Sequence, residues 1–222
     1  MGWLSFQNLD WLEIGTETVN TLSMLVWSTF FAIVIGLPLG VLLFLTSRGQ
    51  LLQNQTFYSI ASIVVNILRS VPFIILMILL IPFTKIIMGT SMGVEGAIPS
   101  LVIGAAPFFA RMVEISLREV DRGVVEAAQS MGATNWQIIW KVLLPEARPG
   151  LIAGITMTTV ALVSYTAMAG AVGAGGLGDL AIRYGYQRFQ TDVAVVTVII
   201  LLMLVQMIQT FGDWLVLRFS RK

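Results

Sequence analysis

Residues 18–47 read TVNTLSMLVWSTFFAIVIGLPLGVLLFLTS and contain no charged side chain. A helix needs about 20 mostly apolar residues to cross a hydrocarbon core about 30 Å thick, so this run is long enough to form a transmembrane helix. We expect the span itself from about Thr21 to Leu45. The run therefore favours an integral membrane protein over a water-soluble domain.

The rest of the chain repeats this pattern. Four further apolar runs follow, at residues 57–83, 96–110, 149–178 (with the span ending near Ala169) and 193–212. The run 57–83 contains Arg69, Pro72 and Pro82, whereas 96–110 is short enough that it could also form a re-entrant segment. We favour five spans. The sequence therefore predicts an all-α integral membrane protein with about five transmembrane helices.

Composition supports this class and narrows the function. Of the 222 residues, 57% are hydrophobic and 11% are charged, whereas an average soluble domain has about 25% charged residues. The chain has no Cys and no His, which excludes thiolate nucleophiles, imidazole acid–base chemistry and the commonest metal ligands. A net charge of +1 gives no indication of a nucleic-acid partner. We expect a chain that is not an enzyme and that binds no cofactor or metal of its own.

The positions of the basic residues predict the orientation in the membrane. With five spans, nine of the thirteen Lys and Arg residues fall on one side, three fall on the other, and Arg69 lies within a span. Because basic loops stay in the cytoplasm, we expect the C-terminus inside and the N-terminus outside. The N-terminal tail carries Asp10, Glu13 and Glu17 without a basic residue, so it lacks the n-region of a cleavable signal peptide. We expect the first span to direct insertion.

The predicted cytoplasmic loop, residues 119–145, holds the longest polar stretch of the chain. Its first half has apolar residues at helical spacing, and Gly132 follows where a helix C-cap belongs. Thr134, with Gln137 three residues later, has the pattern of a capping box that begins a second helix. Pro145 is expected to stop that helix. The loop is thus predicted to be two short amphipathic helices joined at a glycine elbow, which by periodicity alone could simply lie on the membrane interface.

The same loop carries a longer motif. Glu126-Ala127-Ala128, then Gly132 after three residues, then Val142-Leu143-Leu144-Pro145 after nine, resembles the EAA motif of ABC-importer permeases, with Val142 in place of the usual Ile. The resemblance implies a coupling helix that docks in a groove of a separate ATPase subunit, with close docking permitted by Ala127 and Ala128. The coupling residues it implies are Glu126, Ala127, Ala128, Gly132, Thr134, Val142, Leu144 and Pro145. Since the chain has no phosphate-binding loop of the Gly-x-x-x-x-Gly-Lys-Ser/Thr type, ATP and Mg²⁺ would be held by that partner.

Three other stretches narrow the resemblance. Residues 69–76, 104–114 and 164–179 are similar to the methionine-importer subfamily of these permeases. Membership implies one type I transmembrane domain over residues 1–222 in the bacterial cytoplasmic membrane. It also implies a permease homodimer, two ATP-binding subunits and an extracytoplasmic methionine-binding protein. The alternatives are the same machine importing another amino acid or small solute, and a membrane scaffold that does not transport.

A glycine-rich stretch follows the fourth predicted span. Residues 173–178 match Gly-x-Gly-x-x-Gly, and residues 176–179 match the Gly-x-Gly-Asp signature of intramembrane aspartyl proteases. The first motif needs a βαβ unit and the second needs a second intramembrane carboxylate, and neither is predicted here. We interpret the stretch as a tight turn at the outer mouth, serving as an outer gate, a contact for the binding protein, or a purely structural turn. The residues concerned are Gly173, Gly175, Gly176, Gly178 and Asp179.

A few polar or bulky residues within the spans are candidates for a transport path. Arg69 would be costly if it faced lipid, so it is a path residue, an anchor for a kink at Pro72, or a side chain that snorkels because the span begins later. Ser164, Tyr165 and Met168 lie in the fourth span. Tyr165 and Met168 are three residues apart and are expected on one face, with paired Met168 side chains closing the path at a dimer axis.

Close helix packing is expected elsewhere in the spans. Gly36 and Gly40 in the first span and Gly150 and Gly154 in the fourth each have small-xxx-small spacing.

Overall fold

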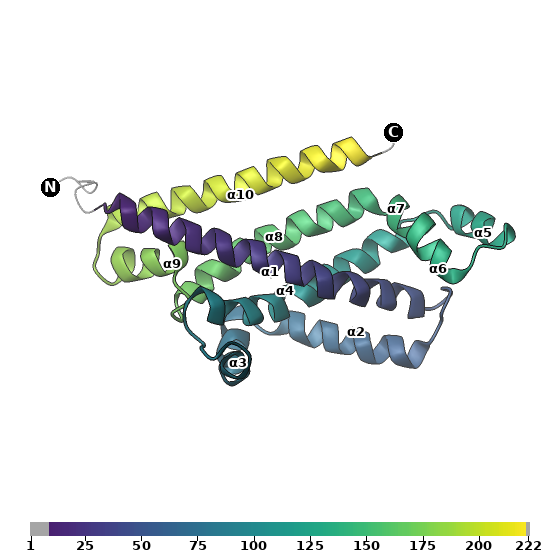
Figure 1. Cartoon of the computed structure of the whole chain (residues 1–222), viewed down its shortest axis with the longest axis horizontal. Coiled ribbons are helices and arrows are strands. Elements are labelled where there is room, and N and C mark those ends of the chain that lie inside the picture. Colours follow the sequence, from purple (N-terminus) through teal and green to yellow (C-terminus); the bar gives the residue numbers. More distant parts are fainter. Residues whose placement is uncertain (1–8, 221–222) are drawn as a thin grey trace.

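The computed structural model describes residues 9–220, and every regular element in that range is helical. Figure 1 shows long helices running side by side, with shorter ones at both ends. The elements are α1 (Trp11–Thr46), α2 (Gln55–Ser70), α3 (Phe73–Met88), α4 (Gly93–Arg118), α5 (Arg122–Ser130), α6 (Asn135–Ile138), the π-helical turn η1 (Ile139–Leu143), α7 (Leu144–Glu146), α8 (Arg148–Gly170), α9 (Gly176–Leu180), the π-helical turn η2 (Ala181–Tyr186) and α10 (Thr191–Phe219).

Within residues 9–220, four helices are long and apolar enough to cross a bilayer, namely α1, α4, α8 and α10, and a fifth span is present if the bent pair of α2 and α3 counts as one. α1 has 36 residues and begins at Trp11, ten residues before the predicted start of the first span. α4 has 26 residues, so the third run extends well beyond residues 96–110 and is a continuous span by length. The prediction of an all-helical membrane protein is therefore confirmed.

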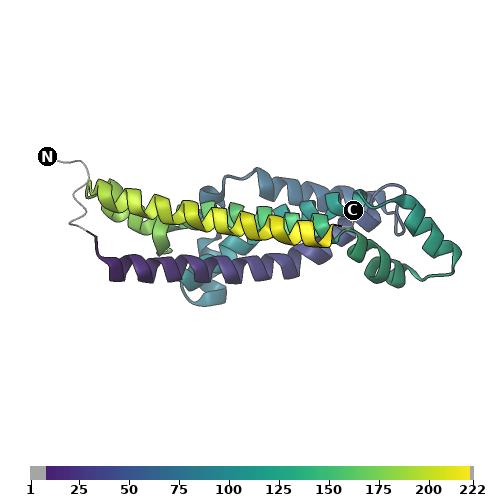
Figure 2. The ribbon, with the colours of Figure 1, turned by 90° about the horizontal axis from the view of Figure 1, so that it is seen from above.

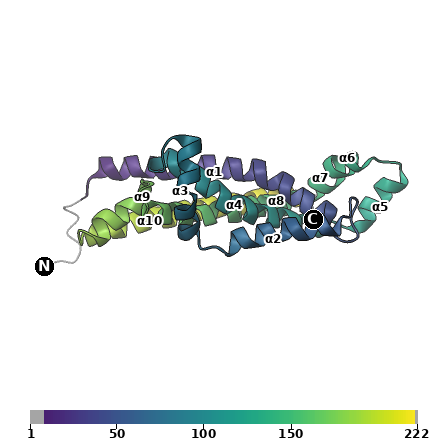
Figure 3. The ribbon, with the colours of Figure 1, turned by 90° about the horizontal axis from the view of Figure 1, so that it is seen from below.

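The second predicted span is not one continuous helix: it is broken into α2 and α3, which together could still cross the membrane as one bent span. The helix path bends by 108° between α2 and α3, around Val71 and Pro72. Proline lacks an N–H donor and its ring disfavours helical backbone at the residue before it, and Val71 is accordingly extended, with ψ 127°. Figures 1 and 3 show α3 running across the long axis of the bundle while α2 runs along it.

α4 lies at the centre of the bundle, and glycines let its neighbours approach it closely. A Cβ added at Gly40 of α1 would lie 2.4 Å from the Ala110 carbonyl oxygen, and one at Gly36 would lie 2.8 Å from that of Ala106. Gly150 of α8 meets α4 in the same way, since its Cβ would lie 2.7 Å from Ser116 Oγ. The small-xxx-small pairs are therefore the points where α1 and α8 pack against α4.

The predicted loop helices form a knob, residues 119–147, that projects beyond one end of the bundle. Figure 2 shows the knob at the end where α10 finishes, opposite the end where α1 begins. The outer faces of α1 and α10 carry exposed large apolar side chains, including Phe30, Phe31, Leu202 and Met207. Such a surface suits a hydrocarbon solvent, so the long helices are expected to lie within the bilayer with the knob outside it.

Candidate coupling surface and transport path

The elbow of the knob has the geometry that the sequence predicts. Gly132 has φ +79°, in the left-handed region that disfavours other residues. Its N–H donates to the Gln129 carbonyl at 2.9 Å, and the Ala133 N–H donates to the Ala128 carbonyl at 3.1 Å. These two bonds form a Schellman motif at the end of α5. The left-handed backbone at residue 132 therefore favours glycine, and the predicted elbow is confirmed.

The second helix of the knob begins with the predicted capping box. The Gln137 side chain accepts from the Thr134 N–H at 2.9 Å, and the Thr134 hydroxyl oxygen accepts from the Gln137 N–H at 3.4 Å. Two N–H groups that a helix start would leave without a partner are thereby satisfied.

Pro145 does not stop this helix, contrary to the prediction. The turn before it is π-helical, with the Leu144 N–H donating to the Ile139 carbonyl, and the helical path continues through Glu146. A π turn is wider than an α turn, which gives the proline ring room, and the missing N–H removes no bond that the wider turn needs. The knob therefore leads directly through Ala147 into α8.

Ala128 is buried inside the knob of the single chain, although the resemblance implied that it permits close docking. It is 5% exposed and packs with Ile138 and Leu143 in an apolar core that also contains Phe44 of α1 and Leu117 of α4. The small side chain of Ala128 thus permits close packing inside the knob, whereas Glu126 and Ala127 are exposed. Val142 and Leu144 are half-buried and pack against the same core, and half-buried Pro145 lines the hollow between the knob and α10.

Two tryptophans of the knob were missed by the sequence analysis. Trp136 is 67% exposed and Trp140 is 53% exposed, and their rings meet edge to face with centroids 5.6 Å apart. Met131 beside the elbow is 82% exposed. Large side chains exposed on a polar helix pair are the usual signature of a contact surface. Their i, i+4 spacing is the signal that could have identified them.

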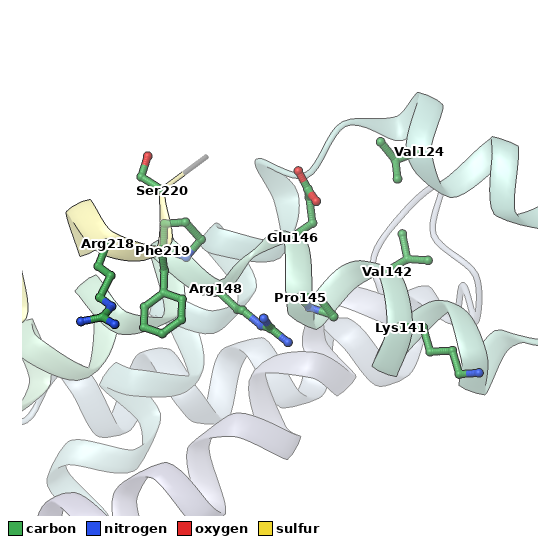
Figure 4. A pocket seen from close by; sticks show the side chains of 10 residues that line it. Val124, Lys141, Val142, Pro145, Glu146, Arg148, Arg218, Phe219 and Ser220 are labelled. Carbon is green, nitrogen blue, oxygen red and sulfur yellow. The ribbon is translucent and has the colours of Figure 1, made fainter. Parts of the chain in front are cut away.

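Hollows flank the knob on both sides. One, of about 490 Å³, is lined by Glu126, Arg118 and Arg122 together with residues of the α1–α2 connection. The other, of about 550 Å³, lies between the knob and the end of α10, and Figure 4 shows the basic side chains of Lys141, Arg148 and Arg218 that three segments contribute to it.

A buried carboxylate joins α2 to α4 and was also missed. Glu114 is 1% exposed and accepts hydrogen bonds from Tyr58 Oη at 3.1 Å and from Arg118 Nη2 at 2.6 Å, and it forms an ion pair with Arg111. Arg111 in turn donates to Ser62 Oγ and Asn66 Oδ1, both at 2.9 Å. The network fixes the first part of α2 along α4.

The glycine-rich stretch is a tight turn held against α1. Gly173, Gly175 and Gly176 all have positive φ, between +76° and +88°. A Cβ at Gly178 would lie 2.3 Å from the Ala167 carbonyl oxygen, so α9 packs on α8 through backbone. The Leu177 N–H donates to Thr21 Oγ1 at 2.8 Å, and Glu17 accepts from the Gly176 N–H. Each glycine has a structural reason, which favours the structural-turn interpretation.

Asp179 takes part in an ion-pair chain with Arg183 and Glu13. Its Oδ2 lies 2.9 Å from Arg183, which also contacts Glu13 of α1 at 3.3 Å. Burial of the guanidinium lowers the pKa of Arg183, but the charges of Asp179 and Glu13 outweigh this and raise it above its ordinary value. Arg183 therefore remains charged and ties η2 to the start of α1.

The break between α2 and α3 brings together two of the path candidates. A hollow of about 270 Å³ is lined by Arg69 and Val71, by Phe73 and Leu76 of α3, by Gly104 and Phe108 of α4, by Leu68, and by Tyr165 of α8. Tyr165 stacks on Phe73 with ring centroids 4.5 Å apart. Pro72 makes the break itself, whereas Ser164 and Met168 are not among the lining residues.

The structure adds detail to three of these candidates. Tyr165 faces inward while Met168 is 45% exposed, because residues three apart on a helix differ by about 60° and here lie on either side of the packing boundary. Arg69 is the penultimate residue of α2, which begins at Gln55, and its side chain is exposed. Fourteen residues of helix rise roughly 21 Å, so Arg69 lies far from the start of α2.

Residues 32–222 of the chain match the family model described as "Binding-protein-dependent transport system inner membrane component". The chain therefore belongs to this family of importer permeases, and the resemblance of its EAA motif is confirmed. As a member it is the non-catalytic membrane component of a transporter.

Relatives narrow the likeness further. The chain is 55% identical over 208 residues to the "Methionine import system permease protein MetP" of Bacillus subtilis, covering 94% of each chain. It is 50% identical over 212 residues to the "Probable D-methionine transport system permease protein MetI" of Pasteurella multocida, covering 96% of this chain and 98% of the relative. Among solved structures, an inward-facing MetNI methionine ABC transporter matches with a TM-score of 0.94 and 49% identity, covering 95% of this chain and 98% of that one.

Proposed function

We propose that the chain is the transmembrane permease subunit of an ATP-driven importer for methionine, working by alternating access. The observation that carries this proposal is near full-length identity of 50% or more to two permeases whose names specify methionine. The knob adds a physical reason, because it exposes Met131, Trp136 and Trp140 over an apolar core at one end of the bundle.

The structure suggests how a partner could move the spans. The core of the knob is continuous with that of α1 and α4, and η1 and α7 lead into α8 without a flexible linker. Packed interiors transmit displacement because they cannot deform continuously. A displacement of the knob by an ATPase subunit would therefore shift the bundle as a body. In this proposal ATP and Mg²⁺ are bound by the partner.

The proposed assembly has two copies of this chain, two ATP-binding subunits at the knob end and an extracytoplasmic methionine-binding protein at the other end. The exposed side chains Met157, Ser164 and Met168 recur at helical spacing on α8, which leaves one face of a central helix available for a second copy. We propose the bacterial cytoplasmic membrane as the location, with the knob and C-terminus in the cytoplasm, as the positive charges predict.

The test is reconstitution in liposomes with the ATPase and the binding protein, followed by uptake of labelled L-methionine against a panel of unlabelled amino acids. We expect uptake that requires ATP and all three components and is competed best by methionine. Uptake competed best by another amino acid would support the same machine with different cargo. ATP-independent partner binding without any uptake would support the scaffold alternative.

A further inference from the structure

The hollow at the α2–α3 break contains a cation without an anionic partner. The described part of the chain holds four ion-pair contacts, and all of them use Arg111, Arg118 or Arg183. Arg69 contacts instead the ring of Phe108, with its guanidinium carbon 5.8 Å from the centroid. Arg69 is exposed at the surface of the single chain, but it lies near the far end of α2, and ionisable residues within membrane-spanning segments commonly mark substrate pathways. The position is therefore suited to an anion that arrives with a ligand.

The break supplies a second favourable element for that anion. α3 has 16 residues and begins directly after Pro72, which offers no side chain to cap it. The first N–H groups of a helix lack intrahelical partners and carry partial positive charge. In transporters with broken helices, such half-helix N-termini commonly face anionic groups of the substrate. Phe73, the first residue of α3, itself lines the hollow beside Arg69.

The remaining walls are apolar and aromatic. Leu68, Leu76 and Phe108 face the hollow together with the stacked rings of Phe73 and Tyr165. A thioether makes favourable contacts with aromatic ring edges and fits irregular apolar space. The volume of about 270 Å³ is at the small end for ligand pockets, which suits a single amino acid rather than a longer substrate.

We infer that this hollow is a substrate subsite of the permease: Arg69 pairs with the α-carboxylate of methionine, and the side chain lies between Phe108 and Tyr165. The inference rests on the proposed methionine import and adds the residues that receive the substrate within the membrane.

The test is uptake of labelled L-methionine by the reconstituted complex, with ATP hydrolysis measured in the same liposomes. Arg69→Gln removes the charge, and we expect uptake to fall at least tenfold while ATP hydrolysis stimulated by the loaded binding protein stays within twofold, because a charge-assisted pair is lost without touching the knob. Arg69→Lys should retain a substantial part of the uptake. Lys85→Gln is the matched control, since it removes a basic charge from the exposed side of α3 outside the hollow, and its uptake should equal that of the unsubstituted complex.

A second variant protects the test from a folding defect. Leu68→Phe narrows the hollow and leaves the charge in place, and it should also lower uptake per ATP hydrolysed. Equal uptake by Arg69→Gln, Leu68→Phe and the unsubstituted complex would overturn the subsite while leaving methionine import intact. If the unsubstituted complex imported no methionine, the proposed function itself would fail, and the subsite with it.

Discussion

The knob and the α2–α3 break are both interruptions of regular helix, but they resolve the interruption in opposite ways. At the knob the backbone groups of the turn find hydrogen-bond partners: Gly132 completes a Schellman motif and Thr134 completes a capping box. The apolar core of the knob also continues into the bundle. At the break the helix turns by 108° and leaves a hollow with an unpaired arginine. A segment whose hydrogen bonds are all formed within the chain is rigid, which suits a part that transmits force. A segment that leaves a charge without a partner suits a part that receives a ligand.

The largest expected effect concerns the network around Glu114, which holds the first part of α2 against α4. Glu114→Gln removes the buried negative charge that Arg111 and Arg118 share. Breaking a buried ion pair typically costs about 3–5 kcal/mol, which we expect as a fall in the unfolding midpoint in detergent of roughly 10 °C. Glu119→Gln, an exposed carboxyl just beyond the same helix, should shift the midpoint by no more than a degree or two. Equal midpoints for the two variants would show that the network does not fix α2.

The next effect concerns the elbow of the knob. Gly132→Leu forces a side chain into left-handed backbone, at a cost of about 1–2 kcal/mol, and should reorient α5 against the second helix. We expect methionine uptake per ATP hydrolysed to fall about tenfold. Gly89→Leu is the matched control, because Gly89 has a similar φ of +74° and equally open surroundings but ends α3 far from the knob. Full coupling in Gly132→Leu would contradict the role of the elbow.

A smaller effect is expected at the capping box. Thr134→Ala removes the hydroxyl that accepts from the Gln137 N–H and should destabilise the start of α6 by about 1 kcal/mol. Hydrogen exchange at residues 134–138 should accelerate severalfold. Ser130→Ala, which removes a hydroxyl that only donates back to the Glu126 carbonyl within α5, should leave exchange in that segment unchanged. Similar exchange in both variants would mean that the box does not order the knob.

The smallest effect is expected at the far end of the molecule. The pKa of Arg183 is higher in the folded protein than in the unfolded chain. The charged guanidinium therefore stabilises the fold fully at a pH below the unfolded-state pKa, and this stabilisation is lost only as the pH rises through the folded-state pKa. Both values lie far above neutrality, and stability should show no step from this group between about pH 6 and pH 9. Asp179→Asn should change stability by roughly 1 kcal/mol or less, as exposed pairs do, and added salt should abolish the difference. A clear step near neutral pH that Asp179→Asn removes would contradict this assignment.

Local patterns predicted local features well. The apolar runs predicted the long helices, Gly132 predicted the elbow, and the Thr134–Gln137 spacing predicted the capping box, because each depends on neighbouring residues. Other features depend on tertiary packing or on an irregular turn. The burial of Ala128 and the packing of Tyr165 on Phe73 depend on contacts with distant segments, and the course of the helix through Pro145 depends on the π-helical turn before it. The hollow beside Arg69 could not be predicted either, because it exists only where α2, α3, α4 and α8 meet.

The central claim is that the knob moves with the bundle as one body, and distances between labels test it directly. The chain contains no Cys, so single cysteines introduced at exposed Ser130 in the knob and exposed Gln53 in the connection between α1 and α2 can carry spin labels. Between nucleotide-free and ATP-bound states of the reconstituted complex, we predict a change in the distance between the two copies of position 130. The distance from 130 to 53 within one copy should stay the same. A change in the 130–53 distance with no change between the two copies would show that the knob bends on its own, and would contradict the account.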